Sequence, residues 1–385
     1  MSSTLSTAAA ITGIGEVGYS RSAPEQSELA LELGAALLAI SDAGLQPRDI
    51  DGLIPFGPAG ACAEDIITNL GLGDLKFSAH TPLGGASAVA AIQCAALAIH
   101  AGLCRHVLVS LGRNGMERKI GARLNAFPQF KAVREFEQPS GMSAPAQLYA
   151  PMARRHMELF GTTSADFAEI ALSTRLHAMR NPMALMTAPM IVEDHQASRV
   201  IADPLRLFDC SIESNGGAAF IVSTAQTAPD LAQHPVLVAG VAEGHPDEPL
   251  AISQRADLTT LGTARAAERA FAMAGIGPED IDLAEIYDCF TYIVLCQIED
   301  LGFCEKGEGG AFVQSGVLRP GGALPVNTHG GLLSQAHMAG YNHVTELVRQ
   351  LRHAAGPAQV PGAQTGLVTG FGDMGDGAVA ILRRG

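Results

Sequence analysis

The chain alternates between Ala-rich stretches, in which apolar residues recur at helical spacing, and short runs that are mostly apolar. The helical stretches occupy residues 27–42, 84–99, 144–160 and 260–273. The strand-like runs occupy residues 52–56, 106–111, 211–224, 236–242 and 283–287, and two more, 366–371 and 378–383, predict a hairpin near the end of the chain. Helices and strands that alternate in this way indicate an α/β fold.

One nine-residue segment occurs twice. Residues 43–51, AGLQPRDID, and residues 274–282, AGIGPEDID, are identical at six of nine positions. Each copy follows an Ala-rich helical stretch and precedes a strand-like run, so that helix, glycine C-cap, proline turn and strand recur in the same order. We predict two halves of similar topology, spanning residues 1–230 and 231–385. An excursion of mixed character at about 113–204 is expected to be inserted in the first half and to cover the site.

The composition permits a large buried core. The 385 residues are 47% hydrophobic with a mean hydropathy of +0.19, so the chain is not disordered. The net charge of −14 argues against general binding to nucleic acid or to an anionic membrane, although local arginines or helix N-termini can still hold an anionic ligand. Seven cysteines without a CxxC pair fit a reduced compartment better than a disulfide scaffold or a zinc ribbon.

No targeting or membrane segment is evident in the sequence. The first 20 residues lack the basic region of a signal peptide. The most apolar helical stretch, 85–99, is shorter than the roughly 20 residues that a membrane-spanning helix needs. We therefore expect a soluble, cytoplasmic protein.

The segment 327–343, NTHGGLLSQAHMAGYNH, carries polar residues where a buried segment should be apolar, which suggests a site. Its polar character comes from three histidines, and two adjacent glycines give its backbone unusual freedom: His329, His337, His343, Gly330 and Gly331. The apolar spacing predicts a helix from about residue 334, with His337 near its start, where the helix dipole favours a neutral imidazole able to act as a base. The alternative is three histidines satisfied within an ordinary loop.

A second stretch with possible chemistry is YDCF, residues 287–290, which lies where a strand is predicted to end and a helix to begin. Open α/β sheets place their reactive groups at such strand ends. There, Tyr287 can act as a general acid, Asp288 can orient a partner and Cys289 can shuttle a proton. The alternative is a tyrosine bonded to the backbone, an aspartate that caps a helix and a buried cysteine.

Together these motifs resemble the thiolase superfamily, and most of all the sterol-carrier-protein-type thiolases and their lipid-transfer-protein homologues. The similarity covers nearly the whole chain. It rests on the repeat, the helix after GGAS at 84–87, YDCF, NTHGGLLSQAHMAG, and the segments 193–210 and 300–308. The resemblance implies a thiolase fold, in which duplicated βαβαβαββ halves build α-β-α-β-α layers.

The resemblance also shows what is missing. Thiolases carry a nucleophilic cysteine at the start of the buried helix, and the register of that helix places Gly85 there. Cys94 lies more than two turns further along and cannot replace it without a register change. A second cysteine, which many thiolases carry in a Cys-x-Gly stretch, is absent from residues 370–373. Tyr287 replaces the histidine of an HDCF motif, and His337 matches the histidine of a Gly-His-Pro motif.

Without the cysteine, the acyl-enzyme of thiolysis and of ordinary Claisen condensation cannot form. Members of the family that resemble this chain, with the cysteine lost and tyrosine in a YDxF motif, act as aldolases in steroid side-chain degradation. This implies a carbon–carbon lyase that cleaves a β-hydroxyacyl-CoA by a retro-aldol reaction to a ketone or aldehyde and a short acyl-CoA. The alternatives are a cysteine-independent acyltransferase or Claisen-type enzyme, and a non-catalytic lipid or acyl-CoA carrier.

We hypothesise that Tyr287 takes the β-hydroxyl proton. His337, where such aldolases typically carry a second tyrosine, is expected to aid the proton transfer or to stabilise the enolate. Asp288 and Cys289 are further catalytic candidates. The residues expected to bind the substrate are Asn327, His329, Gly330, Gly85 and Ser87. We expect no metal and no cofactor on this chain apart from the CoA thioester as substrate. The family also implies a homodimer that pairs with a small protein made of a zinc ribbon and an OB fold.

Overall fold

The structure is a computed structural model of the chain, and it describes residues 5–22, 25–56, 61–117, 130–248, 251–372 and 375–385. The strands of these ranges are β1 (Ala9–Ser20), β2 (Gly52–Pro55), β3 (Phe77–Ser78), β4 (His106–Asn114), β5 (Val200–Ala202), β6 (Leu205–Arg206), β7 (Asn215–Thr224), β8 (Val236–Gly244), β9 (Leu283–Glu285), β10 (Thr365–Phe371) and β11 (Gly377–Arg384). The helices are α1 (Glu28–Asp42), α2 (Ala63–Leu70), α3 (Ser87–His100), α5 (Pro145–Phe160), α6 (Ser164–Ala178), α7 (Val192–Ala197), α8 (Gly262–Ala274), α9 (Thr291–Asp300), α10 (Gly309–Gln314) and α11 (Tyr341–Leu351).

Nine of these strands form one mixed sheet in the order β3-β2-β4-β7-β1-β8-β11-β10-β9. At its centre, β1 pairs briefly with β8 in antiparallel orientation. From this centre the order is mirrored, because β1, β7, β4 and β2 on one side correspond to β8, β11, β10 and β9 on the other. The outermost of these pairs, β2 with β4 and β9 with β10, are parallel, and the pairs between them are antiparallel. The predicted division after residue 230 falls between β7 and β8 and stays a prediction.

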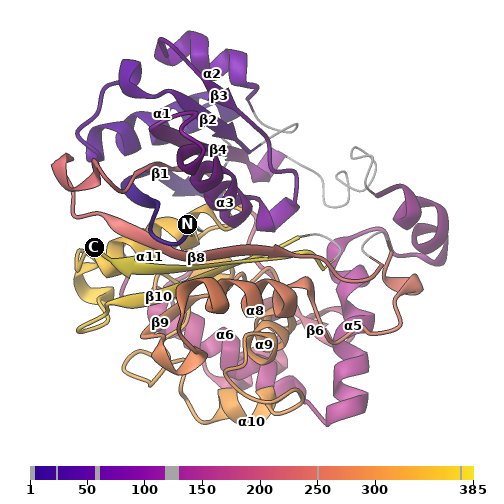
Figure 1. Ribbon diagram of the computed structural model, residues 1–385. Helices are drawn as coiled ribbons and strands as arrows, with labels where there is room; N and C mark the ends of the chain where they lie inside the picture. The colour runs from indigo at the N-terminus through magenta and orange to yellow at the C-terminus, as the bar shows by residue number, and fades with distance from the viewer. Residues whose placement is uncertain (1–4, 23–24, 57–60, 118–129, 249–250, 373–374) are drawn as a thin grey trace.

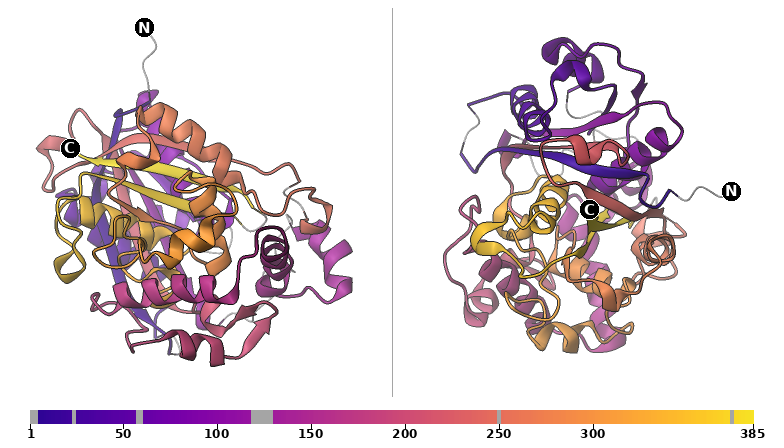
Figure 2. Two further views of the ribbon diagram at one scale, coloured as in Figure 1. Left: turned by 90° about the horizontal axis from the view of Figure 1, so that it is seen from below. Right: turned by 60° about the vertical axis from the view of Figure 1, so that its left-hand side comes forward.

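Helices cover the outer faces of both halves and also lie between them (Figure 1). Helix α1 packs on β1, β4 and β7, and α8 packs on β8 and β11. Helices α3 and α11 contact each other and strands of both halves, so they form a middle layer. The two turned views in Figure 2 show the same arrangement. The predicted α-β-α-β-α layering is thereby confirmed.

Successive side chains of β7 point to opposite faces of the sheet, so the strand contacts a helical layer on each face. Ala219 and Ile221 belong to the apolar cluster beneath α1 and α2, whereas Phe220 and Val222 belong to the cluster around α3 and α11. All four side chains are fully buried. A strand covered on both faces favours apolar residues at successive positions, which is why residues 216–222 include no polar side chain.

The repeated segment makes equivalent hydrogen bonds in both halves. It ends in Asp51 in the first half and in Asp282 in the second. Each carboxylate accepts two backbone hydrogen bonds, at 2.8 to 2.9 Å, from the start of the neighbouring parallel strand, with the donors Arg105 and His106, and Gln364 and Thr365. The aspartate thereby joins each helix–turn–strand unit to the next strand of its sheet.

The helix expected from about residue 334 begins later, at Tyr341. Residues Gly331–Gln335 form a single π-helical turn, and Ala339 and Gly340, at φ +48° and +86°, interrupt the helical path before α11. His337 therefore lies in an irregular stretch and not at a helix N-terminus. The helix-dipole argument for its neutral imidazole does not apply.

The excursion at 113–204 supplies much of the outer helical layer of the second half. Helices α6 and α7 pack together, and α6 also contacts α9, α10 and the π-helical turn (Figure 1). The excursion therefore contacts the stretch that carries His337. Its interpretation as an insertion that covers the site stays a prediction.

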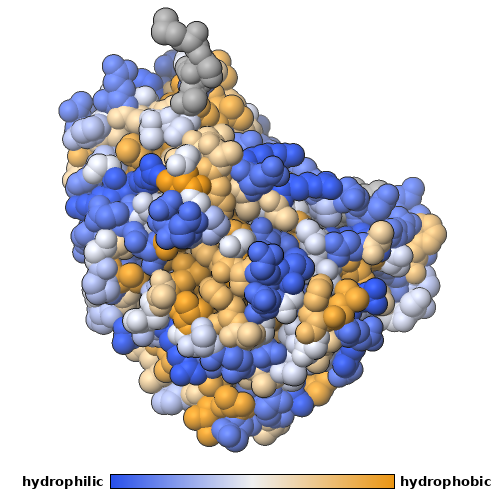
Figure 3. All heavy atoms as spheres, turned by 60° about the horizontal axis from the view of Figure 1, so that its bottom comes forward, coloured by the Kyte–Doolittle hydropathy of each residue, from blue (hydrophilic) through white to orange (hydrophobic). Residues whose placement is uncertain are grey.

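Some large apolar side chains reach the surface. Figure 3 shows one face of the molecule, on which apolar patches are interspersed with polar residues. The exposed apolar residues include a group from α7 to just beyond β6, namely Ile191, Val192, Val200, Ile201 and Leu207. Within the described ranges, no helix combines the length and apolar character that crossing a bilayer would require.

Candidate active site

Tyr287 stands between the end of β9 and the start of α9, where the sequence places it. Its backbone N–H donates to Thr369 Oγ1 at 2.9 Å, and its carbonyl accepts from Gln297 Nε2 at 2.8 Å. These two contacts, one to β10 and one to α9, fix the backbone that carries the phenol. The side chain is 4% exposed, so its hydroxyl acts within a largely water-free environment.

Gly85 lies against the phenol of Tyr287. It belongs to the short turn Gly84–Ala86 that leads into the buried helix α3. A Cβ atom on Gly85 would overlap the Cζ and Oη atoms of Tyr287, and it would stand 2.5 Å from the carbonyl oxygen of Phe371. Real Cβ atoms do not approach other atoms so closely, so glycine is the residue that this position accepts. The ring of Tyr287 fills the space in front of α3.

His337 approaches Tyr287 from the side. Its Nε2 atom lies 3.5 Å from Tyr287 Oη, and the two rings meet edge to face at 86°. Its Nδ1 atom lies 3.0 Å from Ser211 Oγ, and its backbone N–H donates to Ser214 Oγ at 2.8 Å. The geometry thus brings together Tyr287 and His337, both named from the sequence, and adds two serines from the loop before β7.

Ser211 was missed by the sequence interpretation. It follows directly on the segment 193–210 that supports the family resemblance, and it precedes the predicted histidine by 126 residues. Its backbone N–H donates to the carbonyl of Cys289 at 3.0 Å, which joins the loop to YDCF. A serine in a loop carries no chemical signature of its own, and only the fold reveals its position.

Asp288 is fully buried, and its carboxylate holds the π-helical turn. Oδ1 accepts from Leu332 N–H at 2.8 Å and lies 3.0 Å from His343 Nε2, while Oδ2 accepts from Leu333 N–H at 3.2 Å. These contacts resemble the helix-capping alternative considered from the sequence. A Cβ atom on Gly331 would overlap this carboxylate, which explains the glycine there. A catalytic role for Asp288 stays a prediction.

Cys289 is 9% exposed and lies next to the site. All seven cysteines belong to the described ranges, and none of them forms a disulfide. The cysteine of α3, Cys94, lies in the middle of that helix, and burial raises the pKa of its thiol. A raised thiol pKa leaves less thiolate, the nucleophilic form, at neutral pH. A proton-transfer role for Cys289 stays a prediction.

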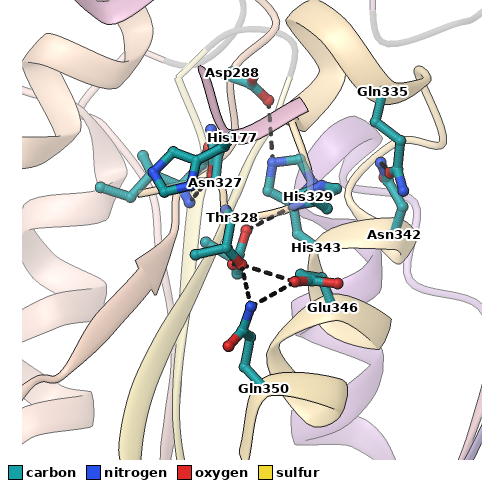
Figure 4. A network of polar contacts seen from close by, with 12 residues as sticks. His177, Asp288, Asn327, Thr328, His329, Gln335, Asn342, His343, Glu346 and Gln350 are labelled. Atoms are coloured by element: carbon teal, nitrogen blue, oxygen red, sulfur yellow. Dashed lines mark hydrogen bonds and ion pairs between the residues drawn. The ribbon is translucent and has the colours of Figure 1, made fainter. Parts of the chain in front are cut away.

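Two of the residues expected to shape the pocket, Asn327 and His329, belong to the polar network drawn in Figure 4. Asn327, at φ +57°, accepts from Ile286 N–H at 2.7 Å and donates to its carbonyl at 2.9 Å, so its amide continues the edge of β9. Gly330 adopts φ +103° and faces Ala178 of α6, where a Cβ atom would come within 2.7 Å of another Cβ. Their roles in substrate binding stay predictions.

His329 forms a buried ion pair. Its Nδ1 atom lies 2.9 Å from Glu285 Oε2, and neither side chain is exposed. Burial, the largest single effect, would lower the pKa of His329, but the carboxylates of Glu285, Glu346 and Asp288 together outweigh it and leave the pKa above its ordinary value. The ring of His329 meets that of His343 edge to face at 4.7 Å, and His343 stacks on Tyr287 at 6.1 Å. His343 therefore packs against the ring of Tyr287, and His329 packs against His343.

Polar contacts connect the segment 327–343 to β1 of the first half. Thr328 Oγ1 lies 2.7 Å from a carboxylate oxygen of Glu285 and 2.8 Å from one of Glu346, so its single proton can be donated to either (Figure 4 shows the second contact). Glu346 is paired in turn with Arg349 at 2.8 Å, and Arg349 also binds Glu16 of β1. A chain of buried polar contacts thus links the stretch 327–343 to the first half.

Ser87 sits at the first turn of α3. Its Oγ accepts from Leu83 N–H at 3.1 Å, and its carbonyl accepts from Thr81 Oγ1 at 3.0 Å. It thereby orders the turn that contains Gly85. Its role in substrate binding stays a prediction.

An aromatic wall stands beside the YDCF turn. Tyr149 of α5 contacts Phe290 at 5.2 Å and Phe371 at 5.7 Å between ring centroids. The excursion therefore brings an aromatic side chain to the turn that carries Tyr287. Among the residues that the structure describes, no group of three His, Cys, Asp or Glu side chains has the arrangement of a metal site.

Comparison with known proteins places this geometry in a family. Residues 244–384 match the family described as "Thiolase C-terminal domain-like". The chain is also 39% identical to the steroid side-chain-cleaving aldolase of Thermomonospora curvata, over 91% of this chain and 92% of that protein. The chain belongs to the thiolase superfamily. Within this superfamily it groups with the aldolase-like carbon–carbon lyases.

Two further comparisons refine this membership. The solved structure of the "Ltp2-ChsH2(DUF35) aldolase" superimposes on this thiolase homologue with a TM-score of 0.92 at 37% identity, covering 99% of this chain and 98% of the other. The acetyl-CoA acetyltransferase of Methanothermobacter thermautotrophicus is 35% identical over 91% of this chain and 93% of that protein. Since lyases and an acyltransferase both occur among the relatives, the site residues have to distinguish the two reactions.

Proposed function

We propose that this protein is a non-thiolytic carbon–carbon lyase that cleaves a β-hydroxyacyl-CoA into a ketone or aldehyde and a short acyl-CoA. One observation carries the proposal: the phenol of Tyr287 stands where a nucleophile on Gly85 would need room. Acyl transfer by the thiolase route needs that nucleophile. Retro-aldol cleavage does not, because it requires only a base for the hydroxyl proton and stabilisation of the enolate.

The reaction balances without a cofactor. A base removes the proton of the β-hydroxyl, the C–O bond becomes a carbonyl, and the bond between Cα and Cβ breaks. Its electron pair passes to the thioester enolate, which takes a proton at Cα to become the acyl-CoA. Because one proton is removed and one is returned, the same residues can serve both steps.

Tyr287 and His337 are the residues to which we assign the proton transfer. Their Oη and Nε2 atoms lie 3.5 Å apart, a separation that a modest shift on substrate binding would shorten to a hydrogen bond. The imidazole can then accept the proton that the phenol passes on from the substrate. Histidine titrates near neutral pH, which suits this role. Asp288 and Cys289 remain further candidates.

A steroid side-chain-like acyl group is the substrate we propose. Two relatives support it by name, the aldolase of Thermomonospora curvata and the 17-hydroxy-3-oxo-4-pregnene-20-carboxyl-CoA lyase of Mycobacterium tuberculosis, which is 40% identical over 90% of this chain and 92% of that protein. The aromatic wall of Tyr149, Phe290 and Phe371 beside the site offers apolar surface to such a group. The pocket roles of Asn327, His329, Gly330, Gly85 and Ser87 belong to this proposal.

We also propose a homodimer that pairs with a small zinc-ribbon/OB-fold protein in the cytoplasm. The aldolase whose structure superimposes on this chain is named for two components, which supports a heteromeric assembly. The exposed apolar residues of α7, β5 and the segment after β6 offer surface for such contacts.

The test is a mass-spectrometric product assay with steroidal and aromatic β-hydroxyacyl-CoA thioesters, with and without the small partner and without free CoA. A ketone or aldehyde with acetyl-CoA or propionyl-CoA is the expected result. Exchange of labelled CoA into the substrate would instead indicate an acyltransferase. Tight binding of the thioesters without any turnover, even with the partner, would indicate a carrier. Either outcome overturns the proposal.

A further inference from the structure

Among the contacts of His337 are three that help to hold it in place, and two of them come from one loop. Ser214 Oγ accepts the hydrogen bond of the His337 backbone N–H at 2.8 Å, and Ser211 Oγ meets His337 Nδ1 at 3.0 Å. The third contact is to Tyr287, on the opposite nitrogen of the ring. Since the backbone of Ser211 also donates to Cys289, the loop is fixed to the same turn that carries Tyr287.

The partner on Nδ1 distinguishes His337 from other histidines of this chain. Four fully buried histidines lie within 2.7 to 3.0 Å of a carboxylate, in the pairs His156–Glu299, His195–Asp209, His329–Glu285 and His343–Asp288. A carboxylate on one nitrogen favours the imidazolium form. A serine hydroxyl orients the ring in the same way but carries no charge, so it adds no comparable preference for the charged form.

We infer that Ser211 is a positioning residue for the lyase reaction: its Oγ accepts the Nδ1–H of His337 and so leaves the Nε2 lone pair directed at the Tyr287 hydroxyl. This inference rests on the proposed function. In this tautomer Nε2 can take up the proton that Tyr287 relays from the substrate. In the opposite tautomer Nε2 would carry a hydrogen, and uptake of the proton would first require the ring to exchange its own.

Three substitutions of Ser211 distinguish a role in orienting His337 from a role in the stability of the fold. Ser211→Ala removes the acceptor, and we expect a fall in kcat of roughly 10- to 100-fold with a KM close to that of the wild type, since a misdirected base affects the chemical step. Ser211→Thr keeps the hydroxyl and is expected to retain most of the activity. Ser41→Ala, on the exposed side of α1, is the matched control that should change nothing.

The third substitution, Ser211→Asp, places a carboxylate on Nδ1. It should raise the pKa of His337 and move the acid limb of the pH profile of kcat upward by about one pH unit. The other titratable groups on the packed elements are Tyr287, Asp288 and Cys289 in the YDCF turn, Cys210 and Glu213 in the loop, and Arg113 of β4, which pairs with Glu213 at 3.0 Å. Because the new carboxylate acts on these groups as well, the ¹⁵N titration of His337 has to show the same shift. An unshifted acid limb in a folded Ser211→Asp enzyme contradicts the inference.

Nitrogen NMR of ¹⁵N-histidine-labelled protein gives a readout that needs no turnover. The signals of His337 are identified by their loss in His337→Gln. We expect Nδ1 protonated and Nε2 unprotonated in the wild type and in Ser211→Thr, and a mixture of tautomers in Ser211→Ala. An unchanged tautomer in Ser211→Ala overturns the inference, whether or not the protein proves to be a lyase. A wild type that fails to cleave any thioester overturns the proposed function and leaves the NMR result to decide the role of Ser211.

Discussion

The phenol of Tyr287 occupies the space that any side chain on Gly85 would need. The first residue comes from the second half of the chain and the second residue from the turn before α3 in the first half. A cysteine nucleophile at position 85 and a tyrosine at position 287 therefore exclude each other in this backbone. A nucleophile at position 85 would therefore require a smaller side chain at position 287.

Gly85→Ala should accordingly destabilise the protein by about 1–3 kcal/mol, the usual cost of forcing an extra group into a packed site. It should also displace the phenol and reduce lyase activity. In a Tyr287→Ala background the same substitution should cost less, because the overlapping ring is gone and only the close contact with the Phe371 carbonyl remains. Chemical denaturation of the wild type, both single variants and the double variant measures this coupling. Equal costs of Gly85→Ala in both backgrounds would show that the two residues do not compete for space.

Tyr287→Phe keeps the ring and removes only the hydroxyl. We expect turnover of the true substrate to fall by at least about 10²-fold, the scale of a general acid–base group, with little change in stability. Steady-state kinetics and a thermal unfolding curve check both parts. Tyr292→Phe is the matched control, because the buried Tyr292 hydroxyl donates to the carbonyl of Leu258 at 3.0 Å, in α9 and away from His337. That variant should lose stability and keep its turnover. Wild-type turnover in Tyr287→Phe would remove Tyr287 from the mechanism.

The combination of Gly85→Cys with Tyr287→His should remove the overlap with the phenol, so that a small shift of the turn away from the Phe371 carbonyl gives room for a thiol at the start of α3. We expect this double variant to form a covalent acyl adduct on incubation with acetyl-CoA, visible by intact-protein mass spectrometry. Gly85→Cys alone should form none, since the phenol still blocks the position. A folded double variant without any adduct would mean that the site lacks other groups that acyl transfer needs.

The ion pair of His329 with Glu285 predicts a pH-dependent stability. The carboxylate raises the pKa of His329 in the folded state, against the opposing effect of burial. A raised pKa stabilises the protein fully below the unfolded-state value of about 6.5, and this contribution is lost as the pH rises through the folded-state pKa. Glu285→Gln breaks the buried pair. It should lower the free energy of unfolding by roughly 3–5 kcal/mol below the folded-state pKa of His329, and by less above it.

Denaturation curves of Glu285→Gln and wild type at several pH values measure this difference. Glu279→Gln, at an exposed position of the second repeat, controls for the removal of a negative charge alone. A destabilisation that is the same at every pH would mean that His329 does not carry a proton in the folded protein.

Much of the fold follows from the sequence because its causes are local. The spacing of apolar residues marks α1, α3, α5 and α8, and the repeat reveals the two similar halves through Asp51 and Asp282, whose side chains bind the backbone of the neighbouring strand. The start of α11 was placed too early for an equally local reason. The helical spacing of apolar residues continues across Ala339 and Gly340. This spacing does not predict that both residues adopt a positive φ, which interrupts the helix.

The site was only partly predictable, because it is assembled from distant segments. Tyr287, His337 and the absence of a nucleophile at Gly85 could be read from motifs. Ser211 could not, since its importance depends on a contact with His337 and not on its residue type. The overlap of Gly85 with Tyr287 was likewise hidden, because spacing along a sequence carries no information about two residues from different halves.

The mirrored strand order about β1 and β8 suggests how such a site can arise from a simpler ancestor. If one half once paired with a second copy of itself across this central strand, duplication and fusion of the gene freed the two copies to diverge. The aspartates of the repeat kept their task, whereas the loops at one end acquired different residues. On this hypothesis Gly85 and Tyr287 lie where the two copies meet, and each copy contributes a residue that a symmetric pair could not have placed there.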